Sequence, residues 1–407
     1  LVNAHHIASD GWSMDIFQRE LLGYYEAWIK KDITFDFAPL SIQYKDYAVW
    51  QKSYLQGEVM QQQATYWKEK LSGFETLELP ADYPRPEKID YRGSGRNFYI
   101  SETLSKQLIA LARENGVSLY SLLLSAFHIL LGRYTGREDI ITGSPIANRH
   151  HAQTEGLIGF FVNTMVNRTQ LSGTQSFKAL MQQVHREQVQ AQQHQDLPFE
   201  KLVEELGVER DLSRHPVFQV MFGVQSFGNE KKALSRQNQY LKPFALTEAY
   251  PVERFDLSLF VDDSEAELKV QASYAVSLFK EEMITQLAGH YIHLLSQLAA
   301  APDALYSRIN LLSAAEQSLQ LSSWNNTEKP YPDTETIHGM FEDQAAKHPG
   351  STALVYEGQT LSYGELNERS NALARHIRKS YQTRTGSAMP PDTLIALLLE
   401  RSLEMVV

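Results

Sequence analysis

The sequence of 407 residues contains no cysteine. Disulfide bonds, zinc sites with thiolate ligands and catalysis by a thiol are therefore excluded, and this composition is typical of a cytoplasmic protein. The sequence also lacks the run of about 20 apolar residues that a membrane-spanning helix needs. The longest candidate, YSLLLSAFHILLGRY, is interrupted by Ser, His and Arg. We expect that stretch to be a buried helix, and we expect no membrane partner.

Positive charge is scarce as well. The chain has 38 Lys and Arg against 49 Asp and Glu, a formal net charge of -11, and no basic run. Such a chain repels phosphate groups, which predicts that nucleic acid is not a partner. Hydrophobic residues make up 43% and charged residues 21%, as in folded globular proteins, and the length predicts two or three domains.

The N-terminal part of the chain predicts a strand followed by a helix. Residues 1–7 are rich in β-forming residues, and we expect a strand there. Ser13 is a plausible N-cap for the next helix, on which large apolar residues recur with helical spacing on one face. These residues are Phe17, Leu21, Tyr24 and Trp28. The segment LPADYPRPEKIDYRGSGR, rich in Pro and Gly, predicts an exposed connection between two lobes.

Helices and strands alternate in the remainder, which predicts an α/β (α+β) fold. Ser101 and Ser118 are the expected N-caps of two helices separated by Asn115-Gly116. Clean alternation on both sides of Asp262-Asp263-Ser264 predicts a β-hairpin. The other expected elements are strands in IITGSPIA, FFVNTMVNRTQL and HPVFQVMFGVQ, and helices over 176–193 and 279–299.

A second unit is expected after a linker at 311–335, where periodicity is lost and Asn, Thr and Pro accumulate. Within 336–407, the pattern predicts two short strands and a helix with Ser362 and Glu365 in capping-box spacing. The first and last residues both fall inside apolar patterns. We therefore expect the sequence to be a fragment of a longer protein.

The opening stretch LVNAHHIASDGW concentrates groups that carry chemistry. If it is a strand, His5 and His6 point to opposite faces, so that one supports and the other acts. An imidazole with a pKa near about 6.5 can take a proton from an attacking nucleophile at neutral pH. Asp10 is suited to pairing with an arginine, and Gly11 allows a close approach of its N–H to developing negative charge.

Two other interpretations of these residues remain open at this point. A metal site would need further ligands, but there is no cysteine and no second His/Glu cluster at ligand spacing, so we predict no metal. The spacing of His5, His6 and Asp10 is equally compatible with a purely structural loop.

Five segments resemble the condensation domains of nonribosomal peptide synthetases, in that family's order. HHIASDG resembles the HHxxxDG motif, which chloramphenicol acetyltransferase-like acyltransferases share. YKDYAVWQ, GLIGFFVNTMVNR, HQDLPFEKLVEEL and RDLSRHPVFQVMF resemble its later segments. WNNTEKPYP and LSYGEL then resemble the junction to an adenylation domain and the first core motif of that domain.

The resemblance implies a chloramphenicol acetyltransferase-like, two-lobed sandwich with mixed sheets and flanking helices. Residues 1–90 would be the remainder of the N-lobe, 91–310 the C-lobe, 311–335 the linker and 336–407 the truncated start of an adenylation domain. It also implies amide-bond formation in an elongation module, between substrates on 4'-phosphopantetheine arms. Upstream donor and downstream acceptor carrier domains bear these arms, the adenylation domain acts in cis, and no cofactor binds directly to the chain.

The resemblance also assigns roles to residues. His6 would be the active-site histidine, either as a general base or as a group that positions the amine. His5 and Asp10 would hold the loop, with Asp10 paired to an arginine in a missing N-terminal part, and the Gly11 N–H would lie near the oxyanion. The candidates for lining the substrate tunnel are Trp12, Ser13, Asn163 and Thr164. The last two are equally suited to satisfying backbone groups.

Two other functions compete with this one. One is a catalytically silent platform that recruits carrier domains, and the intact HHxxxDG motif argues against it. The other is a free-standing acyltransferase, and the fused adenylation start argues against that. Because most of the first lobe would be missing, we expect the fragment by itself to be inactive and to lack a complete adenylation site.

Overall fold

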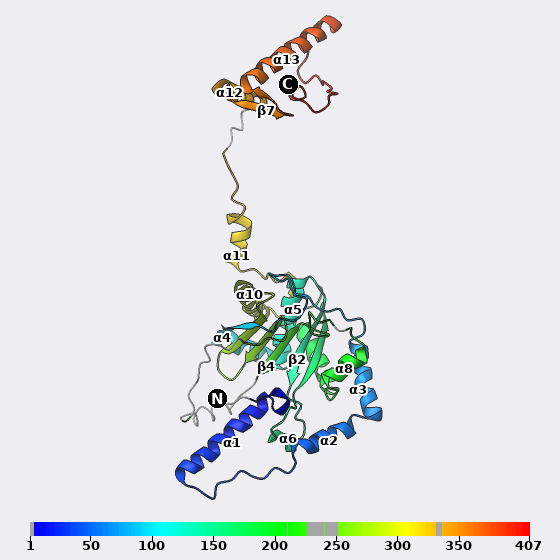
Figure 1. Cartoon of the computed structure of the whole chain (residues 1–407), viewed down its shortest axis with the longest axis vertical. Helices are drawn as coiled ribbons and strands as arrows, with labels where there is room; N and C mark the ends of the chain where they lie inside the picture. Colours follow the sequence, from blue (N-terminus) through cyan, green and yellow to red (C-terminus); the bar gives the residue numbers. More distant parts are fainter. Residues whose placement is uncertain (1–3, 210, 226–239, 241–250, 331–335) are drawn as a thin grey trace. The chain divides into compact units, whose positions relative to one another are not determined.

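A computed structural model describes most of the chain, which divides into two units, residues 1–322 and 323–407 (Figure 1). The described residues are 4–209, 211–225, 240, 251–330 and 336–407.

One mixed six-stranded sheet organises the first unit, in the order β1-β6-β5-β4-β2-β3 (Figure 1). Neighbouring strands are antiparallel except for the β2–β4 and β4–β5 pairs, which are parallel. The strands are β1 (Gly93–Ile100), β2 (Asp139–Ile146), β3 (Asn163–Gln170), β4 (Val220–Gln225), β5 (Leu257–Asp262) and β6 (Leu268–Ala275).

Four helices pack beside one another on this sheet and enclose the main hydrophobic core. They are α4 (Glu102–Glu114), α5 (Leu119–Thr135), α7 (Phe177–Gln192) and α10 (Glu281–Ala300). Helix α5 is buried without interruption from Ser121 to Leu131, which confirms the buried helix predicted for this apolar stretch. Among the described residues, no single helix is long and apolar enough to cross a membrane, and only α4 and α5 together, bent by 109°, pass that test.

Local sequence signals predicted this part of the unit correctly. Ser101 and Ser118 cap α4 and α5 by accepting hydrogen bonds from backbone N–H groups. Gly116 has a φ of 65°, as a residue that ends a helix requires. The β5–β6 hairpin buries Leu268, Val270, Ala272 and Tyr274 on one face.

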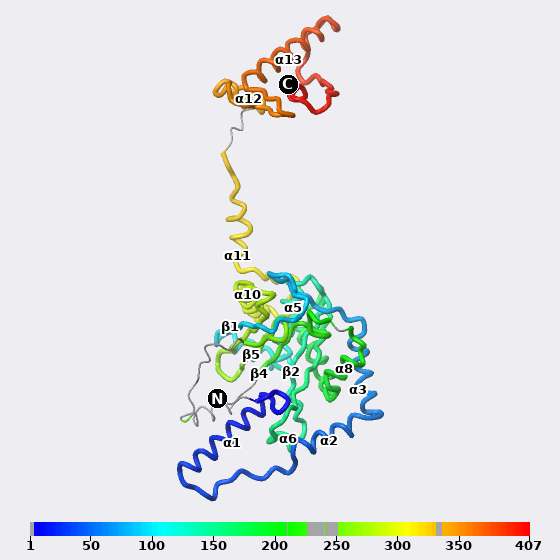
Figure 2. The backbone as a smooth tube through the Cα atoms, viewed as in Figure 1, coloured from blue at the N-terminus to red at the C-terminus, as the bar shows by residue number. Residues whose placement is uncertain are grey.

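Residues 4–92 contribute helices α1 (Gly11–Lys30), α2 (Tyr44–Tyr54) and α3 (Gly57–Lys70), and no strand of the large sheet among their described residues. Figure 2 follows the chain from α1 through residues 31–43, which form neither helix nor strand, to α2. The apolar face predicted for α1 is mostly exposed, and Trp28 is 75% exposed. Helix α1 instead buries Ile16, Leu22 and Ala27.

Two predictions near the N-terminus are wrong. The expected strand at 1–7 is absent in its described part, because His6–Ala8 form a 3-10 helix, while residues 1–3 lie outside the described residues. The N-cap of α1 is Asp10 rather than Ser13, since the Asp10 carboxylate accepts the Ser13 N–H at 2.8 Å. A carboxylate is at least as good a cap as a serine hydroxyl, and it also complements the helix dipole.

The segment that follows α10 contains a short helix that the sequence did not predict, α11 (Ala314–Ser318). Ser313 and Glu316 form its capping box. Glu316 also contacts His290 of α10 at 3.0 Å, and the other ring nitrogen of His290 lies 2.7 Å from the Tyr134 hydroxyl. Residues 313–316 therefore pack on the first unit.

The second unit contains a two-stranded antiparallel sheet flanked by two helices. Ser362 and Glu365 form the predicted capping box, and the predicted Glu-Gly turn lies between the strands. The elements are α12 (Ile337–Lys347), β7 (Thr352–Tyr356), β8 (Gln359–Ser362) and α13 (Tyr363–Thr385).

Candidate active site

The two adjacent histidines lie on the exposed turn that precedes α1. His5 accepts the Ile7 N–H on its Nδ1 at 3.1 Å, so it stabilises the turn. The Nδ1 atom of His6 lies 2.6 Å from the Ser9 carbonyl oxygen. A carbonyl oxygen can only accept, so Nδ1 carries the proton and neutral His6 presents an unprotonated Nε2. The edge of the His6 ring contacts the Phe160 ring at a centroid distance of 5.0 Å.

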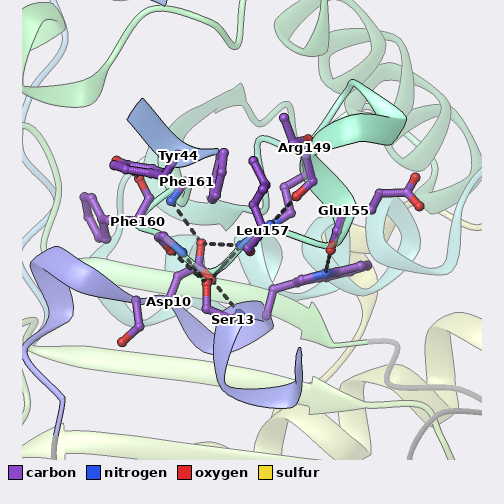
Figure 3. Close-up of polar contacts among 12 residues, drawn as sticks. Asp10, Ser13, Tyr44, Arg149, Glu155, Leu157, Phe160 and Phe161 are labelled. Atoms are coloured by element: carbon purple, nitrogen blue, oxygen red, sulfur yellow. Dashed lines mark hydrogen bonds and ion pairs between the residues drawn. The ribbon is translucent and has the colours of Figure 1, made fainter. Parts of the chain in front are cut away.

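Asp10 lies directly behind this turn and is only 5% exposed. It accepts the Ser13 N–H at 2.8 Å and the Phe161 N–H at 3.0 Å, and it pairs with Arg149 at 3.1 Å (Figure 3). Burial by itself raises the pKa of Asp10, but hydrogen bonds from Ser13 and Phe161 and the positive charge of Arg149 outweigh it. The pKa of Asp10 is therefore below its ordinary value, and the residue is a carboxylate at neutral pH.

Arg149 is the arginine that pairs with Asp10, so the prediction that this partner lies in a missing N-terminal part is wrong. Its side chain is 3% exposed and donates to the carbonyl oxygens of Thr154 at 2.5 Å and Leu157 at 2.8 Å. The guanidinium also lies 4.0 Å from the centre of the Phe161 ring. Charge pairing, two carbonyls and a cation–π contact thus hold Arg149 in one orientation. Its place directly after the strand IITGSPIA is the only sequence signal that marks it.

Ser13 was predicted to line the substrate tunnel, but it is fully buried and does not face an open channel. Its hydroxyl accepts the Gly159 N–H at 3.0 Å and lies 2.8 Å from the Gly159 carbonyl oxygen. A Cβ at Gly159 would lie 2.2 Å from the ring of Tyr44, so only glycine fits there. Ser13 and Gly159 therefore join the start of α1 to the GLIGFF segment.

Gly11 and Trp12 lie at the exposed start of α1. Gly11 is the first helical residue, and a Cβ there would meet nothing within 4 Å, so packing within the chain does not require glycine. Trp12 is 46% exposed, and its indole N–H donates to the Glu155 carbonyl oxygen at 3.1 Å. Both residues are thus accessible beside His6, and their roles toward a substrate stay predictions.

Asn163 satisfies backbone groups, one of the two roles considered for it. Its amide nitrogen donates to the carbonyl oxygens of Gln195 and Leu197 at 2.9 and 2.8 Å, and its amide oxygen accepts the Phe199 N–H at 3.0 Å. Both ends of the amide therefore hold the turn before α8 (Phe199–Leu206). Thr164 is half-buried on β3, and its role as a tunnel residue stays a prediction.

The YKDYAVWQ segment forms α2 and packs against the site. The Tyr47 ring contacts Phe161 at a centroid distance of 4.7 Å, and the Tyr44 hydroxyl donates to the Phe160 carbonyl oxygen at 2.8 Å. Asp46 completes a capping box at the start of the helix. These contacts give the segment a packing role beside the site. Within the described part of the chain, no three His, Asp or Glu side chains are grouped so that they could hold a metal ion.

Comparison with family models divides the chain in two. Residues 1–321 match the model described as condensation domain, and residues 341–407 match the model described as AMP-binding enzyme. Among curated proteins, the chain is 40% identical to a linear gramicidin synthase of Brevibacillus parabrevis and 38% identical to gramicidin S synthase 2 of Brevibacillus brevis. Both alignments cover 100% of this chain but only 8% and 9% of the relatives, so the chain spans less than a tenth of their length.

Solved structures share the fold. A four-domain nonribosomal peptide synthetase, holo-AB3403 bound to AMP and glycine, has a TM-score of 0.77 at 22% identity, covering 92% of this chain and 29% of that one. The X-domain from teicoplanin biosynthesis has a TM-score of 0.66 at 27% identity, covering 76% and 71%. The first condensation domain of the calcium-dependent antibiotic synthetase has a TM-score of 0.61 at 19% identity, covering 76% and 66%.

Proposed function

The chain belongs to the condensation-domain family of nonribosomal peptide synthetases, and on this basis we propose that it forms an amide bond between two carrier-bound substrates. The family resemblance and the α/β fold class predicted from the sequence are confirmed. The donor is an acyl or peptidyl thioester on an upstream carrier domain. The acceptor is an aminoacyl thioester on a downstream carrier domain, and its free amine reacts.

The reaction requires one bond to form and one to break. The acceptor amine nitrogen attacks the donor carbonyl carbon, the C–N bond forms, the C–S bond breaks, and the donor arm leaves as a thiol. The proton lost by the amine ends on that thiol. A thioester is already activated, so alignment of amine and carbonyl supplies much of the rate.

The observation that carries the proposal is the 2.6 Å contact between His6 Nδ1 and the Ser9 carbonyl oxygen. Since Nδ1 donates to the Ser9 carbonyl, the exposed Nε2 can accept a hydrogen bond from the amine, orient it and take its proton. The Asp10–Arg149 pair holds the start of α1 immediately behind this turn. Gly11 is in the first turn of α1, where backbone N–H groups have no partner within the helix, and so its N–H is suited to the oxyanion.

The partners follow from the same proposal. The 4'-phosphopantetheine arms belong to the carrier domains, and no cofactor is assigned to this chain. The AMP-binding match at 341–407 supports an adenylation domain in cis, after a linker at about 311–335. Residues 1–90 and 91–310 are proposed as parts of the N-lobe and the C-lobe.

The test replaces His6 by alanine in a synthetase module that contains this sequence with its flanking domains. We expect condensation to fall by a factor of about 10² or more, as for loss of a general base, while loading of both carriers stays unchanged. His151→Ala, which removes an exposed histidine outside the site, is the matched control. A His6→Ala rate within twofold of wild type would remove His6 from catalysis.

The same assay separates the silent docking platform from the enzyme. The likeness to the teicoplanin X-domain, which was solved in complex with OxyB, keeps that alternative relevant. A platform would bind loaded carriers without forming the amide, in wild type and His6→Ala alike. Amide formation by the wild type that His6→Ala abolishes is the result expected of the enzyme.

A further inference from the structure

Besides its own contacts, the backbone of the preceding residue, Asn148, contributes to the orientation of Arg149. Asn148 is buried and has a φ of 53°, in the left-handed region that few side chains other than glycine and asparagine adopt easily. This conformation turns the backbone immediately before Arg149. Any contact that holds the Asn148 side chain therefore also helps to hold Arg149 against Asp10.

The Asn148 side chain is contacted by His150, the residue that follows Arg149 in the chain. Its Nε2 lies 2.8 Å from the Asn148 amide oxygen and 3.3 Å from the Asp196 carboxylate. Both of these atoms are acceptors, so Nε2 carries a proton and donates to them. The His150 side chain is 35% exposed and the Asp196 side chain 25% exposed, so the contact is partly shielded from water.

Asp196 belongs to a turn that is held from several directions. Asn163 bonds the carbonyl oxygens of Gln195 and Leu197, and the Trp67 indole N–H donates to the His194 carbonyl oxygen at 2.7 Å. The Tyr54 hydroxyl donates to the Asp196 carboxylate itself at 3.2 Å. The turn therefore offers His150 an acceptor at a fixed position.

We propose that His150 is a positioning residue for the condensation reaction: bound to Asp196, it holds Asn148 and thereby keeps Arg149 paired with Asp10. These hydrogen bonds connect the HQDLPFE segment to Asp10 at the start of α1, in addition to any packing between the two. The inference rests on the proposed function, because it assigns a role in that reaction.

The test compares two substitutions at His150 in the same module. His150→Phe keeps a ring but removes the donor, whereas His150→Gln keeps an N–H donor. We expect His150→Phe to lower kcat about tenfold, the loss of one or two hydrogen bonds to a polar partner, with KM for both carriers unchanged. We expect His150→Gln to stay within about threefold of wild type. His151→Phe and His151→Gln are matched controls, since the His151 ring contacts the Trp50 ring.

A second measurement is independent of activity. In the 407-residue chain, amide hydrogen exchange over residues 148–161 should be about tenfold faster in His150→Phe than in His150→Gln, because only the former releases the turn. Equal kcat for His150→Phe and wild type would overturn the proposal, as would equal losses in the two His150 variants. If the wild-type module forms no amide, the proposed function fails, and the exchange difference alone decides whether His150 holds the Arg149 turn.

Discussion

Replacing Arg149 by methionine tests whether the buried ion pair with Asp10 holds the start of α1. Methionine keeps the apolar stem of arginine but ends before the guanidinium, so the cation–π contact with the Phe161 ring is lost as well. The charge and the donors to Asp10, Thr154 and Leu157 are lost. The perturbation is therefore electrostatic more than steric.

The expected magnitude follows from what the variant leaves unpaired. Removing one partner of a buried ion pair costs about 3–5 kcal/mol. Asp10 keeps its hydrogen bonds from Ser13 and Phe161, which limits the cost of the lone carboxylate. Two carbonyl oxygens lose a donor, each worth about 1 kcal/mol. We expect a loss of about 3–5 kcal/mol in the free energy of opening at the start of α1.

The loss should depend on pH in a defined direction. The pKa of Asp10 in the folded chain is below the ordinary value of 3.8, so its contribution to stability is present above that value and is lost as pH falls through the folded pKa. The difference between wild type and Arg149→Met should accordingly be full at pH 7. It should shrink as pH falls below 3.8 toward the folded pKa of Asp10, because protonation of the carboxyl removes the charge that Arg149 pairs with.

Amide hydrogen exchange at residues 9–16 is the assay, because it reports this turn of the chain rather than global unfolding. Asp10→Asn and the double variant complete a double-mutant cycle. Since the double variant leaves no unpaired charge, it should be less destabilised than the sum of the two single variants. A loss below about 1 kcal/mol, or additive single variants, would show that the pair does not hold the loop.

Three further changes test other parts of the first unit. Burial, with a smaller effect of Lys70, lowers the pKa of His128 from 6.5 to about 3. Between these values only the unfolded chain binds the proton, so stability falls as pH drops below 6.5, by at most about 1.4 kcal/mol per pH unit. His128→Leu should therefore make the urea-unfolding midpoint depend less on pH between 7.5 and 5.5, and parallel profiles for variant and wild type would contradict this. Asn163→Leu removes the side-chain partner of two carbonyl oxygens and of two N–H groups, so it should cost about 2–4 kcal/mol and speed proteolysis at 193–199. Cleavage at the wild-type rate would show that Asn163 does not hold this turn. Glu316→Ala removes both the capping box and the His290 contact, so exchange at 314–318 should rise while that of α10 stays constant; unchanged exchange at 314–318 would show that neither contact holds α11.

Local signals in the sequence predicted most elements of the first unit after residue 92. The serine caps of α4 and α5, the buried α5 and the alternating β5–β6 hairpin each depend on residues within a few positions of one another. The prediction failed at residues 4–7, the described part of the expected strand, where a 3-10 helix begins at His6. There the contact between His6 and the Ser9 carbonyl and the capping of α1 by Asp10 outweigh the intrinsic strand preference of these residues. Both provide hydrogen bonds within the segment itself, whereas a strand would need hydrogen-bond partners from a neighbouring segment.

By itself, the sequence determined the family and the order of its motifs, because each motif consists of residue types at short spacing. The resemblance, rather than the spacing alone, made His6 the candidate histidine. Only the tertiary structure decided that Asp10 pairs with Arg149, 139 residues away, that Ser13 is buried against Gly159, and that Asn163 holds the turn before α8. Contacts between distant segments leave no periodicity in the chain. They depend on which buried polar groups the fold brings within hydrogen-bonding distance. Each pairing is required because a polar group that is buried without a hydrogen-bond partner is energetically costly.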